Sequence, residues 1–224
     1  MKKSLFLTLF ILFSLLCLKK GCERIQTFMK PLPVFTVVID AGHGGPDPGK
    51  VGINDILEKD INLQIALLLS SYLKQNDVRV IMTREEDTSL STSTSHAKLS
   101  DLQNRKEIME ESHAEAVISI HQNSFPSQSV HGAQVFYGTN NPSGKQLAIL
   151  LQSRLLKADP SNTRSPKENG DYYLFRNISL PIVIVECGFL SNPTEASLLA
   201  NPIYQKKLAW QLHLGILEYL RRQI

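Results

Sequence analysis

Two histidines and two glutamates in this chain have the types and positions that metal-dependent hydrolysis requires. His43 lies in a glycine-rich loop, Asp40-Ala-Gly-His-Gly-Gly45, directly after an apolar run. His121 and Glu186 each follow directly on a β-branched run, and Glu58 comes in the next segment after His43. A polar group placed at the end of a buried run is costly unless it has a partner or a task. These four residues are therefore the candidates for a functional site.

If His43, Glu58 and His121 bind one metal ion, the ligand set is two imidazoles and one carboxylate. Zinc accepts this mixture, and three protein ligands leave a fourth position for water. Zinc lowers the pKa of bound water from about 15.7 to near 7, so hydroxide becomes available at neutral pH. Glu186 would then act as general base on the water and later as proton donor to the leaving group.

Simpler interpretations of the same residues stay open at this point. The loop around His43 is also what a glycine turn that carries a histidine by chance would look like. Asp55-x-x-Glu58 has the spacing of a capping box, in which the glutamate bends toward its own helix terminus and not toward a metal. His131, which precedes a later apolar run, is a further candidate close to the expected site.

The elements that must position these residues alternate along the chain. Apolar, β-branched runs predict strands at 34–40, 78–82, 116–120, 132–137 and 181–185. Helical spacing and capping signals predict helices from Asn54 or Asp55 to about 75, over 99–112 and 143–157, and after the Asn-Pro pairs at 192–193 and 201–202. Polar loops are expected at 88–95 and 159–170.

This alternation predicts the fold class α/β, as a single three-layer domain with a mostly parallel, twisted sheet and helices on both faces. Ligands of such sheets bind beyond the carboxyl ends of the strands. Since His43, His121 and Glu186 each follow a predicted strand, the fold would bring them together.

The first twenty residues differ from the rest of the chain. Lys2 and Lys3 precede an apolar tract that ends at Leu18, which is typical of an export signal. Residues 1–20 are interpreted as a signal peptide or a signal anchor that touches the membrane, 21–33 as a linker, and 34–224 as the catalytic domain. The protein is therefore expected outside the cytoplasm.

Composition excludes several other classes of protein. The net charge of +3 is too small to indicate a nucleic-acid partner. The three cysteines form neither a disulfide framework nor a Cys-x-x-Cys zinc cluster.

Four linked motifs resemble the signature of the zinc-dependent N-acetylmuramoyl-L-alanine amidases. They are Asp40-Ala-Gly-His-Gly-Gly45, Leu57-Glu-Lys-Asp60, Ser119-Ile-His-Gln-Asn123 and Val185-Glu-Cys-Gly-Phe-Leu-Ser-Asn192. Thr83-Arg84 followed by Asp87, and Leu102-x-x-Arg105, match as well. The resemblance covers about residues 34–222. Within the family, the chain is most similar to the germination-specific amidases of spore-forming bacteria, which act in making the muramic-δ-lactam of cortex peptidoglycan.

The resemblance implies zinc on His43, Glu58 and His121, with Glu186 as the catalytic glutamate. The expected reaction is hydrolysis of the amide between N-acetylmuramic acid and L-alanine in peptidoglycan of the cell wall or spore cortex, with an exported accessory protein as a further expected partner. Two other classes stay open: another zinc hydrolase, such as a carboxypeptidase, and a non-catalytic wall-binding module for which Glu186 would be dispensable.

Overall fold

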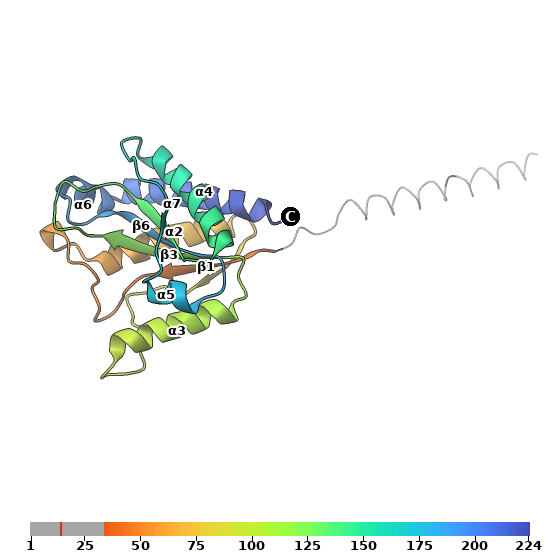
Figure 1. The fold of residues 1–224 in the computed structure, drawn as a ribbon, viewed down its shortest axis with the longest axis horizontal. Helices are drawn as coiled ribbons and strands as arrows, with labels where there is room; N and C mark the ends of the chain where they lie inside the picture. Colours follow the sequence, from red (N-terminus) through yellow and green to blue (C-terminus); the bar gives the residue numbers. More distant parts are fainter. Residues whose placement is uncertain (1–13, 15–33) are drawn as a thin grey trace, which may run out of the picture. The chain divides into compact units, whose positions relative to one another are not determined.

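A six-stranded sheet with the strand order β2-β1-β3-β6-β4-β5 forms the centre of the domain (Figure 1). The computed structural model describes residues 34–224 and Ser14, so the predicted leader and linker lie outside the described residues except for that serine. The strands are β1 (Thr36–Ala41), β2 (Arg79–Met82), β3 (Ala116–Asn123), β4 (Gln134–Tyr137), β5 (Lys167–Glu168) and β6 (Ile182–Phe189).

Pairing in this sheet is parallel with one exception. Strand β1 runs parallel to β2 and β3, and β3 runs parallel to β6. Strand β4 is parallel to β5 but antiparallel to β6. The mostly parallel sheet predicted from the sequence is confirmed.

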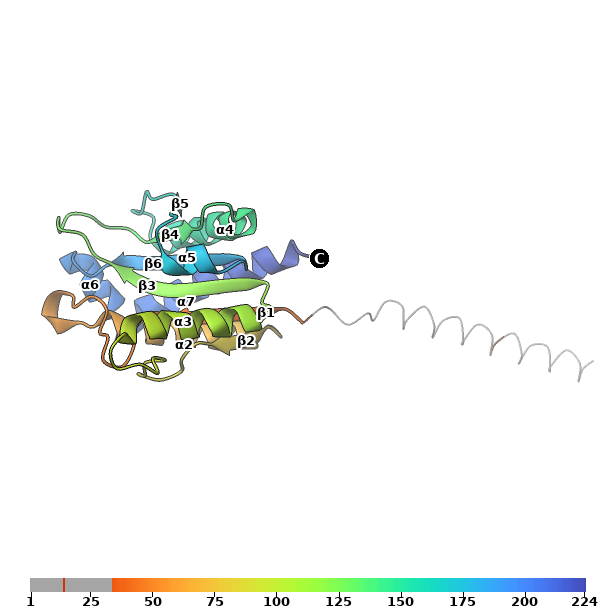
Figure 2. The same cartoon turned by 60° about the horizontal axis from the view of Figure 1, so that its bottom comes forward.

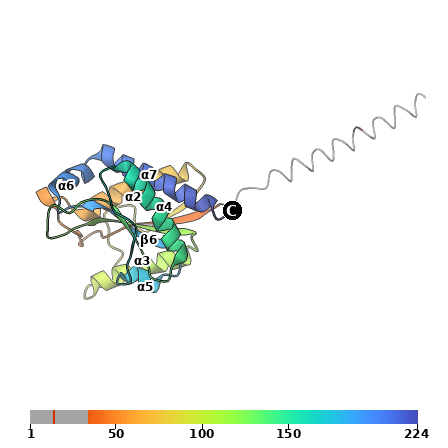
Figure 3. The ribbon, with the colours of Figure 1, turned by 45° about the horizontal axis from the view of Figure 1, so that its top comes forward.

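Helices cover both faces of the sheet, as predicted. Helices α2, α4 and α7 gather on one face (Figures 1 and 3), whereas α3 and α5 lie on the other, where α3 crosses in front of the strands in Figure 2. The helical elements are η1 (Ile53–Asp55), α2 (Glu58–Lys74), α3 (Ala97–Glu111), α4 (Pro142–Ala158), α5 (Tyr173–Asn177), α6 (Pro193–Leu199) and α7 (Pro202–Arg221). The asparagines predicted to cap α6 and α7 accept backbone N–H groups at those helix starts.

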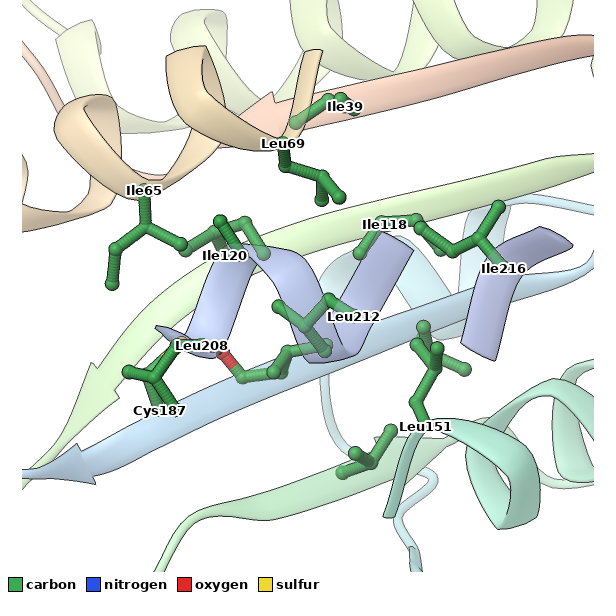
Figure 4. Close-up of a cluster of buried hydrophobic side chains, with 14 of the residues drawn as sticks. Ile39, Ile65, Leu69, Ile118, Ile120, Leu151, Cys187, Leu208, Leu212 and Ile216 are labelled. Atoms are coloured by element: carbon green, nitrogen blue, oxygen red, sulfur yellow. Dashed lines mark hydrogen bonds between the residues drawn. The ribbon is translucent and has the colours of Figure 1, made fainter. Parts of the chain in front are cut away.

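The larger core lies between the sheet and the helices α2, α4 and α7. Figure 4 shows Ile39 of β1 and Ile118 of β3 facing leucines and isoleucines of these helices. Alternate strand residues, such as Val38 and Val117, belong to a smaller core beneath α3 and α5. Because side chains alternate along a strand, Asp40, His121 and Glu186 belong to the face covered by α3 and α5.

Several element boundaries differ from the sequence prediction. Strands β3 and β6 do not end at His121 and Glu186 but continue to Asn123 and Phe189, because the two strands keep pairing through these residues. The predicted loop over 159–170 contains the short strand β5, and α5 was not predicted. Neither element is long enough to produce a periodic hydrophobic pattern.

Residues Phe35–Ile224 form one compact unit. In the part of the chain that the structure describes, no helix has the length and apolar character needed to cross a membrane. The predicted signal segment is outside that part.

Candidate active site

His43 stands in the tight loop that follows β1. Its backbone has a φ of 62°, in the left-handed region that non-glycine residues rarely adopt. Its ring Nδ1 lies 2.9 Å from Asp47 Oδ2, and its Nε2 lies 3.2 Å from Glu58 Oε1. The neighbouring Gly42 is required here, because a Cβ atom at this position would lie 2.2 Å from Cε1 of His121.

Glu58 is the first residue of α2, and its side chain turns toward the sheet. Its Oε1 lies 3.0 Å from His121 Nδ1 and accepts the backbone N–H of Gln122, while its Oε2 accepts the backbone N–H of Lys50. The residue before the helix is Leu57, and among the described residues no side chain caps this helix start. The capping-box interpretation of Glu58 is therefore wrong. Helix α2 also starts later than predicted, because Asn54 and Asp55 belong to η1 and Leu57 is the residue that precedes the helix.

Three candidate ligand atoms come together at this point. One donor atom each from His43, Glu58 and His121 lies within 4.8 Å of the other two. The two imidazole rings meet edge to face, with centroids 5.0 Å apart and planes at 80°. This spacing and the nitrogen and oxygen donors fit a small divalent cation such as zinc. His43 Nδ1 donates a hydrogen bond to Asp47 Oδ2, which orients the ring and leaves its Nε2 directed toward Glu58.

The charges of the cluster favour a cation. Burial lowers the pKa of His43, but the hydrogen bonds and charges of Glu58 and Asp47 outweigh that effect and raise it to about 9. Burial likewise opposes the charged form of Glu58, but His121 and His43 hold the pKa of this carboxyl far below its ordinary value. Glu58 is thus an ionised carboxylate, the form in which it can bind a metal.

Glu186 lies beside this cluster on the neighbouring strand, where it is the register partner of His121. It is 7% exposed, and its Oε2 has no hydrogen-bond partner among the described residues. Burial is the main cause that raises the pKa of Glu186 to about 7. The charge of His121 lowers this pKa, whereas the charge of Glu58 raises it further. A buried carboxyl that can hold or release a proton near neutral pH suits general acid–base work.

A cavity of about 330 Å³ opens over the four residues. Its wall also includes Lys98 and Leu102 of α3 and the segment Tyr172–Leu174 at α5. Of these wall residues, only Leu102 belongs to a motif visible in the sequence, and α5 is too short to produce a periodic pattern. Tyr172 is packed edge to face against Phe136 and Phe175, which fixes it at the wall of the cavity.

The candidate His131 and the cysteine that follows Glu186, Cys187, do not line this cavity. His131 lines a separate hollow of about 490 Å³ together with Asp159 and Tyr204, so its expected place near the site is wrong. Cys187 is fully buried in the larger core, and burial raises the pKa of its thiol. This cysteine serves packing and not nucleophilic chemistry.

Comparison with known proteins decides the family. The model of the N-acetylmuramoyl-L-alanine amidase family matches residues 37–218. The chain belongs to this amidase family. It is therefore a hydrolytic enzyme of peptidoglycan, and the resemblance inferred from the four motifs is confirmed.

The amidase is similar to curated relatives over most of its length. It is 42% identical over 193 residues to the germination-specific N-acetylmuramoyl-L-alanine amidase of Bacillus subtilis, an alignment that covers 84% of this chain and 81% of that protein.

Solved structures agree with this assignment. The CwlD amidase of Clostridioides difficile, solved in complex with the GerS lipoprotein, matches with a TM-score of 0.80 and 40% identity over 84% of this chain and 98% of that one. The catalytic domain of the amidase CwlV from Bacillus (Paenibacillus) polymyxa var. colistinus matches with a TM-score of 0.74 and 33% identity, over 84% and 99% of the two chains. These matches confirm the α/β fold.

Proposed function

We propose that this amidase holds one zinc ion on His43, Glu58 and His121 and uses Glu186 for proton transfer. The observation that carries the proposal is the convergence of three donor atoms within 4.8 Å beside a buried glutamate oxygen that lacks a described partner. When bound, zinc would supply Lewis-acid chemistry that activates water and polarises the amide carbonyl. The proton transfers are carried out by the side chain of Glu186.

Glu186 takes the proton from the attacking water as the water oxygen bonds to the carbonyl carbon of the lactyl group. The same carboxyl then gives this proton to the nitrogen of L-alanine as the carbon–nitrogen bond breaks. The products are the free lactyl carboxylate of N-acetylmuramic acid and a stem peptide with a free amino terminus. The walls at α3 and α5 limit water around the carboxyl, which keeps its proton affinity high.

We further propose that the substrate is spore cortex peptidoglycan and that cleavage prepares muramic-δ-lactam needed for germination. Support comes from the 42% identity to a relative named germination-specific. The experiment is mass spectrometry of cortex peptidoglycan treated with the full-length chain. Muropeptides that have lost the stem peptide at the lactyl group are expected, together with free L-alanine amino termini. Release of only carboxyl-terminal stem residues would instead support a carboxypeptidase.

An exported lipoprotein is proposed as an accessory partner, because the similar CwlD amidase was solved in complex with the lipoprotein GerS. Tagged full-length chain expressed in its own spore-forming host is expected to co-purify with an exported lipoprotein. Recovery of the chain alone, with full activity on cortex peptidoglycan, would contradict this proposal.

Residues 1–20 are proposed to direct export, and residues 34–224 to form the catalytic domain. A chain that begins near Pro33 should fold and stay soluble, because Phe35–Ile224 form a compact unit of their own and the apolar tract lies before it. Circular dichroism and size-exclusion chromatography would check this expectation. Aggregation of the shortened chain, under detergent-free conditions in which the full chain is well behaved, would contradict it.

A further inference from the structure

Arg105 reaches from α3 into the loop that carries His43. The side chain is 2% exposed. Its Nη1 donates to Asp40 Oδ1 at 2.6 Å and to the carbonyl of Ala41 at 2.8 Å, and its Nη2 donates to the carbonyl of His43 at 2.6 Å. Its Nε donates to Asp101 on the same helix at 2.6 Å. The guanidinium thus links α3, the end of β1 and the backbone of a candidate metal ligand.

A second arginine holds the same loop from another side. Nε of Arg84 donates to the carbonyl of Ala41 at 2.9 Å, and its Nη2 donates to the carbonyl of Gly42 at 3.1 Å. The three consecutive carbonyls of residues 41–43 therefore all accept hydrogen bonds from buried guanidinium groups. Two arginines directed at one short loop indicate that its conformation has to be held in place.

The reason lies in the backbone of His43, which adopts a left-handed conformation without being glycine. Such a conformation persists only where surrounding contacts over-determine it. The bond from Arg105 to the carbonyl of His43 is one of these contacts. Asp40, which itself accepts from Thr83 and Ser119, keeps the Arg105 guanidinium in place.

Helix α3 offers no broad apolar face to explain why Arg105 is buried. Its buried residues are Ser100, Arg105 and Met109. The contact of this helix with the core therefore depends largely on one arginine and one methionine. Of these two, only Arg105 touches the metal-ligand loop, which makes Met109 a natural control.

We propose that Arg105 is a positioning residue for the metal ligand His43: its two terminal nitrogens tie Asp40 to the His43 carbonyl and so hold the imidazole toward Glu58 and His121. This inference rests on the zinc site of the proposed function. The proposal also explains the arginine of the motif Leu102-x-x-Arg105, to which the sequence alone assigned no role.

The test compares Arg105→Lys with Met109→Ala in the full-length chain, purified in mild detergent and freed of metal. Lysine keeps a positive charge beside Asp40 but lacks the planar fork that reaches two acceptors at once. Zinc affinity, measured by competition with a chromophoric chelator, is expected to fall roughly 10–100-fold in Arg105→Lys, as for other losses of support around metal ligands. The visible spectrum of bound Co²⁺ should change with it.

Met109→Ala is expected to lower the thermal midpoint of unfolding while keeping wild-type zinc affinity and Co²⁺ spectrum. If Arg105→Lys does not fold, the double variant Asp40→Asn/Arg105→Met, which removes both buried charges, supplies the same readouts and is expected to bind zinc weakly.

Wild-type affinity and spectrum in a folded Arg105 variant would overturn the inference, as would an equal loss of affinity in Met109→Ala. A wild-type chain that binds no zinc would overturn the proposed function instead.

Discussion

Replacement of Glu186 by glutamine is expected to lower amidase activity on peptidoglycan by about 10²–10⁴-fold, the usual contribution of general acid–base catalysis. Glutamine keeps the shape and hydrogen-bonding capacity of the side chain but cannot accept a proton from water. Glu186 is buried beside the candidate metal ligands, and its Oε2 has no partner among the described residues, so the substitution should leave the fold intact.

Activity is measured as free L-alanine amino termini released from cortex peptidoglycan, with any accessory lipoprotein supplied. Glu168→Gln, which changes an exposed glutamate of β5, is the matched control and should retain wild-type activity. Full activity in Glu186→Gln would show that another group moves the proton.

The second large effect is expected from the metal ligands. His43→Ala and His121→Ala should each reduce zinc from about one ion per chain toward none, because two remaining protein ligands are too few for a stable site. Glu58→Gln should weaken zinc binding sharply, since it removes the only negative charge among the three donors. His131→Ala is the control, because His131 lines a different hollow.

Zinc content is measured by atomic emission after dialysis against metal-free buffer. Normal zinc in both histidine variants would contradict the ligand assignment. Normal zinc affinity in Glu58→Gln alone would show that this carboxylate supports the histidines through hydrogen bonds and does not bind the metal.

The sequence predicted the sheet well where hydrophobic burial determines the structure. The β-branched runs before Asp40, His121 and Glu186 become three adjacent strands of the sheet, because such runs are stable only when covered on both faces. Their lengths were predicted less well. Pairing between β3 and β6 continues through His121 and Glu186. The residue pattern of one segment does not show where its pairing with a neighbouring strand ends.

The side-chain direction of Glu58 could not be read from its own segment. Capping-box spacing and metal-ligand spacing are the same there, and only the fold brings His121 to within 3.0 Å of the carboxylate. Asp47 and Tyr172 were missed for a related reason. Their importance comes from contacts with His43 and with the cavity wall, and neither residue belongs to a periodic pattern.

The measurement that tests the central claim most directly is the zinc content of purified Glu186→Gln chain whose loss of activity has been established. The claim is that His43, Glu58 and His121 hold the metal while Glu186 moves the proton. It predicts about one zinc ion per chain, as in the wild type, with three protein ligands. An inactive chain that has also lost its zinc would contradict the claim, because Glu186 would then be a fourth ligand.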